Sequence, residues 1–164
     1  MFRNILVPID LEEPHFSDRA IRLAIKGARD SGAELHLLTV IPGSSTPLVS
    51  SYFHQAAIKK ASGKAAMDLK HFVASSIPGS IPVHLHVLDG LPAEQILKCA
   101  RDIDADLVIM AAHNREYMDA EAMGSTSSRV VEKARCSVVV LRADADRERF
   151  EFQLSDQPIS AAVF

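Results

Sequence analysis

The chain reads ADLVIMAAHNREYMDAEAMGS from residue 105 to residue 125, and this stretch decides the fold. Its first part, ending at Met110, is an apolar run typical of a strand buried on both faces of a parallel sheet. A polar loop follows, and Gly124 and Ser125 stand where a helix is expected to begin. The first backbone N–H groups of a helix have no intrahelical partner and lie at the positive end of its dipole. The stretch therefore predicts an α/β domain with an anion-binding turn.

Strand and helix patterns alternate along the rest of the chain. Further short apolar runs predict strands at 5–9, 34–41, 82–88 and 137–141, with periodic helical patterns between them. Asp89 and Gly90 predict a turn after the third strand. This alternation is typical of a parallel sheet with right-handed crossovers and helices on both faces. Ligands bind such sheets beyond the carboxyl ends of the strands, which points to residues 8–10 and 111–114.

Length and composition exclude several classes of protein. The 164 residues predict one domain with a substantial core, and the net charge of −3 gives no footprint for nucleic acid or an anionic membrane. No apolar run approaches the roughly 20 residues that span a bilayer, and the start of the chain lacks a signal-peptide pattern. Cys99 and Cys136, without a C-x-x-C motif, fit buried thiols in a reducing compartment. We therefore expect a soluble, cytoplasmic protein.

Several segments, taken in order, resemble parts of one known family. The chain reads NILVPID at 4–10, DADLVIM at 104–110 and VVEKARCSVVV at 130–140. Between the last two, Ala111, Asn114 and Gly124 keep the spacing of an ATP signature: Gly, two residues, Gly, nine residues, then Gly followed by Ser or Thr. On these segments the chain resembles the universal stress protein family over residues 1–142. Residues 143–164 are left as a C-terminal tail.

This resemblance implies both a fold and a ligand. The implied fold is a doubly wound α/β domain whose five-stranded parallel sheet has the order 3-2-1-4-5, with helices on both faces (adenine nucleotide alpha hydrolase-like). The implied ligand is ATP or another adenine nucleotide, with or without Mg²⁺. The implied nucleotide-binding residues are Pro8, Ile9, Asp10, Val40, Met110, Ala111, His113, Asn114, Gly124, Ser125, Thr126 and Ser127. The implied homodimer pairs through the last strand, Ser137 to Arg142.

Individual roles follow for some of these residues. The Asp10 carboxylate would accept hydrogen bonds from ligand amine or hydroxyl groups; an Asp in this place can also cap its own loop, but the resemblance favours the ligand role. Val40 would form a wall of the base pocket. Gly124 and the hydroxyl residues after it would hold phosphate, and His113 would touch phosphate or ribose. A Ser- and Thr-rich segment is also typical of a helix N-cap.

Two features of the loop leave a second function open. Ala111 and Asn114 replace the two glycines of the signature, which would permit positive φ and close backbone approach. Glu116, Asp119 and Glu121 would repel a triphosphate unless a divalent cation bridges them. One hypothesis is an adenine-nucleotide-binding stress or signalling module that acts through dimer or partner binding. The other is a dimeric interaction module of the same family that has lost ATP binding.

Motifs that would indicate an enzyme are absent from the sequence. There is no Gly-x-x-x-x-Gly-Lys-Ser/Thr loop, no Gly-x-Gly-x-x-Gly turn after the first strand, and no suitable Lys after the last strand for a response regulator. No pair of general base and metal ligands stands out. We therefore expect no enzymatic activity beyond slow ATP hydrolysis.

One histidine pair and the tail complete the candidates. His84 and His86 share a face of the third strand and could chelate a metal, but no third ligand is evident from the sequence. We interpret this face as an exposed edge strand and expect no metal site. In the tail, Phe150, Phe152 and Leu154 alternate, which fits either a frayed terminus or an arm that docks on the dimer or on a protein partner.

Overall fold

The computed structural model describes residues 1–42, 52–112 and 124–142. His113, Asn114, the acidic loop residues and the tail from 143 to 164 lie outside these ranges. The elements are β1 (Asn4–Pro8), a 3-10 turn η1 (Pro14–Ser17), α1 (Asp18–Ser31), β2 (Glu34–Pro42), α2 (Tyr52–Ser76), β3 (Val83–Gly90), α3 (Pro92–Asp102), β4 (Leu107–Ala112), α4 (Ser125–Lys133) and β5 (Ser137–Arg142).

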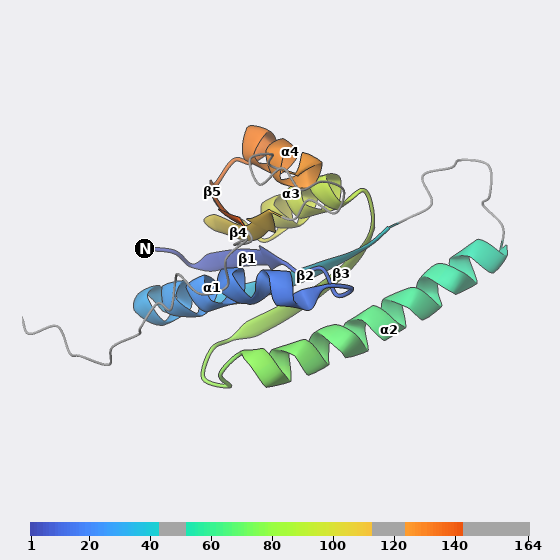
Figure 1. The fold of residues 1–164 in the computed structure, drawn as a ribbon, viewed down its shortest axis with the longest axis horizontal. Helices are drawn as coiled ribbons and strands as arrows, with labels where there is room; N and C mark the ends of the chain where they lie inside the picture. The colour runs from blue at the N-terminus through green and yellow to red at the C-terminus, as the bar shows by residue number, and fades with distance from the viewer. Residues whose placement is uncertain (43–51, 113–123, 143–164) are drawn as a thin grey trace, which may run out of the picture.

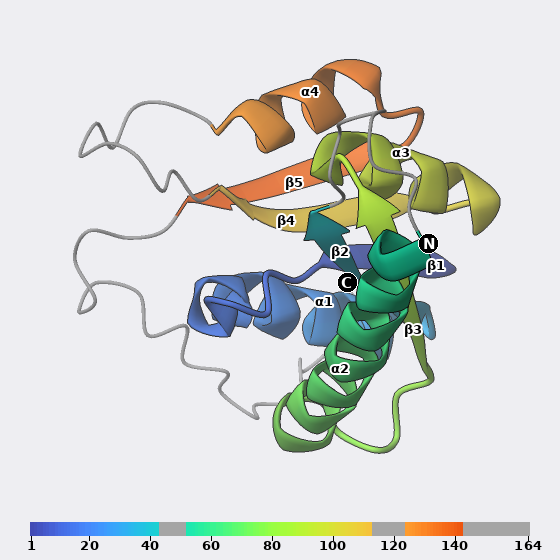
Figure 2. The ribbon, with the colours of Figure 1, turned by 90° about the vertical axis from the view of Figure 1, so that its right-hand side faces the viewer.

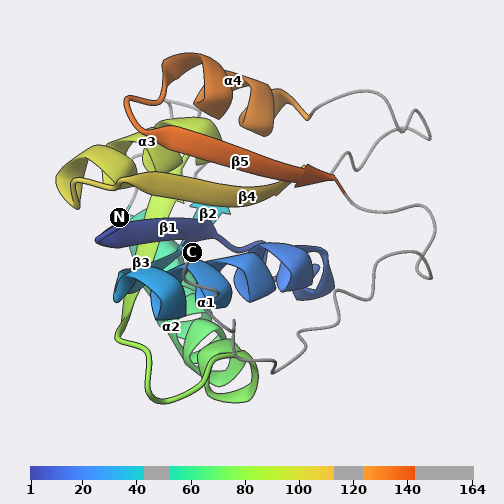
Figure 3. The same ribbon diagram turned by 90° about the vertical axis from the view of Figure 1, so that its left-hand side faces the viewer.

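These elements form three layers, with one sheet between two pairs of helices. The five strands pair in parallel in the order β3-β2-β1-β4-β5. Helices α1 and α2 cover one face of the sheet, and α3 and α4 cover the other (Figure 1). Figure 3 shows β4 and β5 side by side, with their arrowheads at the same end of the molecule. The predicted fold class and strand order are confirmed.

The core consists of two apolar clusters, one on each face of the sheet. Ile5 and Val7 of β1 pack under α1 and α2, whereas Leu6 between them packs under α3 and α4. All three side chains are fully buried. This explains the continuous apolar runs in the sequence, because a strand covered on both faces has no polar side.

Gly32 and Pro92 mark helix boundaries that the sequence signals correctly. Gly32 follows α1 with φ of 70°, the left-handed conformation that glycine adopts without steric cost. Pro92 is the first residue of α3, where its missing N–H has no helical partner to lose.

The turn predicted at Asp89 and Gly90 is wrong. These two residues continue β3 and pair with Ile41 and Pro42, because β2 also runs to its Pro42. Gly90, the last residue of β3, has φ of 130°, a conformation that favours glycine, and α3 begins two residues later at Pro92. Asp89 and Gly90 do lie at the end of a strand, but both still pair with β2 and therefore belong to β3.

Asp106 ties the amino end of β1 to the segment before β4. Its Oδ2 accepts hydrogen bonds from the backbone N–H of Arg3 at 2.7 Å and of Asn4 at 2.9 Å. The donors at Asn4 and Arg3 hold the pKa of this carboxyl below its usual value, since they stabilise the charged form. Asn4 adds a bond from its Nδ2 to the carbonyl of Ile103 at 2.8 Å.

Replacing Asp106 with alanine should lower the free energy of unfolding by about 1 kcal/mol at pH 7, since the partly exposed carboxylate contributes less than a buried one. The lowered pKa means that the wild-type carboxylate stabilises the fold above its unfolded-state pKa of about 3.8. That contribution disappears as the pH falls through the folded-state value. Urea unfolding of both proteins across the acid range measures it. A difference that persists after the carboxyl is protonated would contradict the charge-based origin.

Candidate functional site

A cleft opens where the carboxyl ends of β1, β2 and β4 meet. It has a volume of about 740 Å³ and is bounded by α2, by the start of α3 and by the start of α4. Figure 2 shows β1 and β4 as neighbours between the two helix layers. The helices that follow β1 and β4 cover opposite faces of the sheet, so this edge is the topological switch point where α/β proteins bind ligands.

Most of the predicted site residues lie together along this cleft. Ten of the twelve line it: Pro8, Ile9, Asp10, Val40, Met110, Ala111, Gly124, Ser125, Thr126 and Ser127. His113 and Asn114 lie outside the described residues. The residues come from four separate segments of the chain, and the parallel sheet brings them to one edge. Their contact with a nucleotide stays a prediction.

The amino end of α4 borders the cleft with backbone N–H groups that have no acceptor within the helix. Gly124 is the N-cap, and its carbonyl accepts the N–H of Ser128 at 3.0 Å as the first helical bond. The N–H groups of the first turn precede that bond and have no intrahelical acceptor. In the described part of this turn there is no acidic side chain and no side-chain cap. A phosphate oxygen or another anion would satisfy these donors.

Asp10 has a structural role that the sequence left open. One of its carboxylate oxygens accepts the backbone N–H of Glu12 at 3.0 Å, a typical Asp turn two residues on. The residue is exposed at the cleft rim, directly after the buried strand β1. Because a carboxylate offers about four acceptor positions, this bond leaves capacity for a ligand hydroxyl or amine.

The walls of the cleft are largely apolar and include residues that the sequence analysis missed. Thr39 precedes Val40 at the end of β2 and is only 5% exposed, so the strand-end rule alone could have identified it. Ser17, which the sequence predicts as the cap of the first helix, is the N-cap residue of α1, but its side chain makes no capping hydrogen bond; it is 3% exposed and lines the cleft. Lys64 and Asp68 of α2 also line the cleft, but no sequence motif signals them.

The described part of the cleft carries more negative than positive charge. Asp10, Glu12 and Asp68 are acidic, and Lys64 is the one basic residue among the described lining residues. The Nζ of Lys64 lies 3.2 Å from the Oδ2 of Asp68, one turn further along α2. The apolar walls of such a cleft suit a flat ring such as a nucleobase. A highly charged phosphate chain would be repelled by the acidic side chains unless α4 or a cation compensated its charge.

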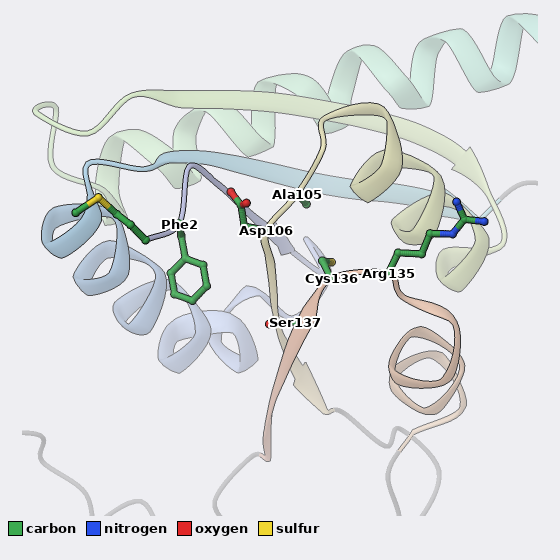
Figure 4. A pocket seen from close by; sticks show the side chains of 7 residues that line it. Phe2, Ala105, Asp106, Arg135, Cys136 and Ser137 are labelled. Carbon is green, nitrogen blue, oxygen red and sulfur yellow. The ribbon is translucent and has the colours of Figure 1, made fainter.

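A second hollow lies at the amino ends of the strands (Figure 4). Its volume is about 650 Å³, and Phe2, Asp106, Arg135 and Cys136 are among its lining residues. Figure 4 shows the Arg135 side chain extending away from Asp106, and Asp106 already holds the backbone of Arg3 and Asn4. This surface is open and lies at the wrong end of a parallel sheet for ligand binding. It is not a candidate site.

Fold and cleft together define a doubly wound α/β domain with a cleft at its switch point. Residues 1–142 match the model of the universal stress protein family, and the chain belongs to this family. Its relatives include universal stress protein G of Escherichia coli O157:H7, which is 28% identical over 148 residues. That alignment covers 87% of this chain and all of the relative.

Solved structures show the same fold. Universal stress protein UspA from Lactobacillus plantarum is 29% identical, with a TM-score of 0.64, and the match covers 85% of this chain and 97% of that one. Hypothetical protein MJ0577 has a TM-score of 0.76 at 23% identity, covering 89% and 99% of the two chains. Two further neighbours at 18% identity are a universal stress protein in complex with cAMP and one from Archaeoglobus fulgidus in complex with dAMP. Their TM-scores are 0.56 and 0.54, so they share the fold.

No helix within the described ranges combines the length and the hydropathy that a membrane crossing requires.

Proposed function

We propose that this protein is an adenine-nucleotide-binding stress-response module, without enzymatic activity beyond slow ATP hydrolysis, which acts through its dimer or a protein partner. The observation that carries the proposal is the cleft, where ten residues implied by family resemblance line one edge of the sheet. The complexes of structural neighbours with cAMP and dAMP support adenine as the base.

The cleft offers a different surface to each part of an adenine nucleotide. The apolar side chains of Ile9, Val40 and Met110 provide walls for the base. Asp10 at the rim would accept hydrogen bonds from ribose hydroxyls. The free N–H groups at the start of α4 would hold the first phosphate, as helix N-termini do for anions. Ala111 adds only a methyl group where the signature has glycine.

The acidic balance of the cleft predicts a dependence on Mg²⁺ for triphosphates. We expect ATP to bind about tenfold more weakly when Mg²⁺ is removed, because uncompensated phosphate charges approach Asp10, Glu12 and Asp68. Adenosine, which carries no phosphate, should bind equally with and without Mg²⁺. Calorimetric titration of the purified protein with both ligands, in Mg²⁺ and in EDTA, measures the difference. An equal response of ATP and adenosine to EDTA would contradict the assigned phosphate position.

Mass spectrometry of ligands released from the freshly purified, denatured protein tests the proposal directly. A co-purified adenine nucleotide, or micromolar affinity for ATP with Mg²⁺, would support the nucleotide-binding function. The absence of both at millimolar ATP would instead support the second candidate, a dimeric interaction module without a nucleotide. The unbalanced acidic charge of the described lining favours that second candidate.

The same proposal includes a homodimer formed through β5. This strand is an edge of the sheet, and Val138 to Val140 are half-buried on it. An apolar edge strand with free backbone groups readily pairs with another strand. A second copy of β5 would cover this edge. Nucleotide binding in the cleft could then change how the two copies associate.

We also propose that the protein is cytoplasmic, because neither of its two cysteines is in a disulfide. Cys99 and Cys136 are both free. Burial raises the pKa of the Cys99 thiol to about 11, with the nearby Asp102 adding to the shift, and burial also raises that of Cys136. Thiols with raised pKa values are poor nucleophiles and fit packing roles in a reducing compartment.

A further inference from the structure

The strands β2 and β3 bring four side chains of metal-ligating type onto one face of the sheet. Their parallel register pairs His36 with His84 and Leu38 with His86. Alternation along β2 places Glu34 on the same face as His36, and His84 and His86 share that face on β3. None of these four residues belongs to the described lining of the nucleotide cleft.

Close contacts already link these four residues in two pairs. Nε2 of His84 lies 2.8 Å from Oε2 of Glu34, and Nδ1 of His36 lies 3.0 Å from Nε2 of His86. The rings of His36 and His84 stack, with centroids 4.8 Å apart and planes inclined by 17°. One ligand atom each from Glu34, His36 and His84 lies within 4.8 Å of the other two.

His36 carries the observation that a simple hydrogen-bonded cluster does not explain. The residue is 8% exposed, and its buried Nε2 has no hydrogen-bond partner among the described residues. If Nδ1 donates its proton to His86, the unpartnered Nε2 holds a lone pair. A histidine whose other ring nitrogen is held by a hydrogen bond is the usual arrangement around a protein-bound metal.

We propose that Glu34, His36 and His84 bind one Zn²⁺ ion, and that His86 orients His36 as a positioning residue. Two imidazoles and a carboxylate suit zinc, whereas Mg²⁺ and Ca²⁺ prefer sites built from oxygen alone. Ligand atoms about 2.0–2.1 Å from a tetrahedral zinc lie roughly 3.3 Å apart, whereas those of the cluster lie within 4.8 Å of one another. The His84 ring also stacks on His36, so it must turn until its lone pair meets the ion. Glu34 and His84 can move to achieve this, because the side chain of each is 50% exposed. Water would occupy the fourth position.

Zinc titration of the untagged protein tests the site. The protein is stripped with a chelator, separated from it, and titrated with Zn²⁺ against a fluorescent zinc indicator in the absence of nucleotide. We expect one zinc per chain and a higher melting temperature in the zinc-bound protein. His84→Gln and Glu34→Gln, both at half-exposed positions, should each weaken binding by about 100-fold or more. His71→Gln, an exposed histidine of α2, is the matched control and should bind zinc as the wild type does.

Cobalt substitution adds a spectroscopic readout of the ligand set. Co²⁺ in the wild type should show the intense visible bands of a tetrahedral site with nitrogen and oxygen ligands, and His84→Gln should lose them. No zinc binding by the wild type at micromolar concentrations would overturn the proposal. Binding that His84→Gln and Glu34→Gln leave unchanged would also overturn it, because the metal would then lie elsewhere, for example at the cysteines.

Discussion

Replacing Gly124 with valine should weaken adenine-nucleotide binding by about 100-fold, the loss expected when charge-assisted hydrogen bonds worth about 3 kcal/mol are removed. Gly124 is the N-cap of α4 and lines the cleft beside the N–H groups of the first turn, which have no acceptor within the helix. A valine side chain there would block a phosphate from approaching those donors. Calorimetric titration with ATP and Mg²⁺ measures the loss.

The conformation of Gly124 makes this substitution a test of binding rather than of folding. Its φ of −57° and ψ of 152° are accessible to valine, so no left-handed strain is introduced. Gly79→Val is the matched control, since a Cβ at Gly79 meets nothing within 4 Å. Both variants should keep the wild-type melting temperature to within a few degrees, and Gly79→Val should also keep its affinity. Unchanged affinity in a folded Gly124→Val protein would remove the phosphate role from α4.

The sequence predicts the sheet and much of its ligand edge because both depend on local patterns. Buried strands of a parallel sheet appear as apolar runs, and the residues that follow them must meet at one edge. Pro8 to Asp10 and Met110 to Ala111 reach the cleft for this reason. The strand order itself came from family resemblance, since alternating strands and helices alone allow several orders.

Contacts that depend on packing between distant elements could not be predicted. Lys64 and Asp68 reach the cleft only through the angle at which the long helix α2 crosses the sheet. The histidine cluster depends on the register of β2 against β3, which sets His36 beside His84. The sequence alone suggests no third ligand for His84 and His86, because Glu34 and His36 lie about 50 residues earlier and no local pattern indicates that the two strands pair.

The edge strand β5 allows the proposed dimer to be tested without disturbing the fold. The backbone N–H of Ser137 donates to the carbonyl of Asp106, so this residue faces the β4 side. Backbone groups of successive strand residues point to alternate sides. Val139 therefore bonds toward β4, whereas the N–H of Val140 points to the open edge where a second copy would pair.

Replacing Val140 with proline should raise the dimer dissociation constant by about 100-fold or more, because each copy loses an N–H donor and gains a ring at the paired edge, at a cost of about 3 kcal/mol. Proline is tolerated on an edge strand when its missing N–H faces outward, so the monomer should stay folded. Val139→Pro is the matched contrast: it removes a bond to β4 and should lower the melting temperature strongly. Sedimentation velocity measures the assembly of wild type and variants. A monomeric wild type, or a folded Val140→Pro protein that still dimerises, would show that β5 is not the interface.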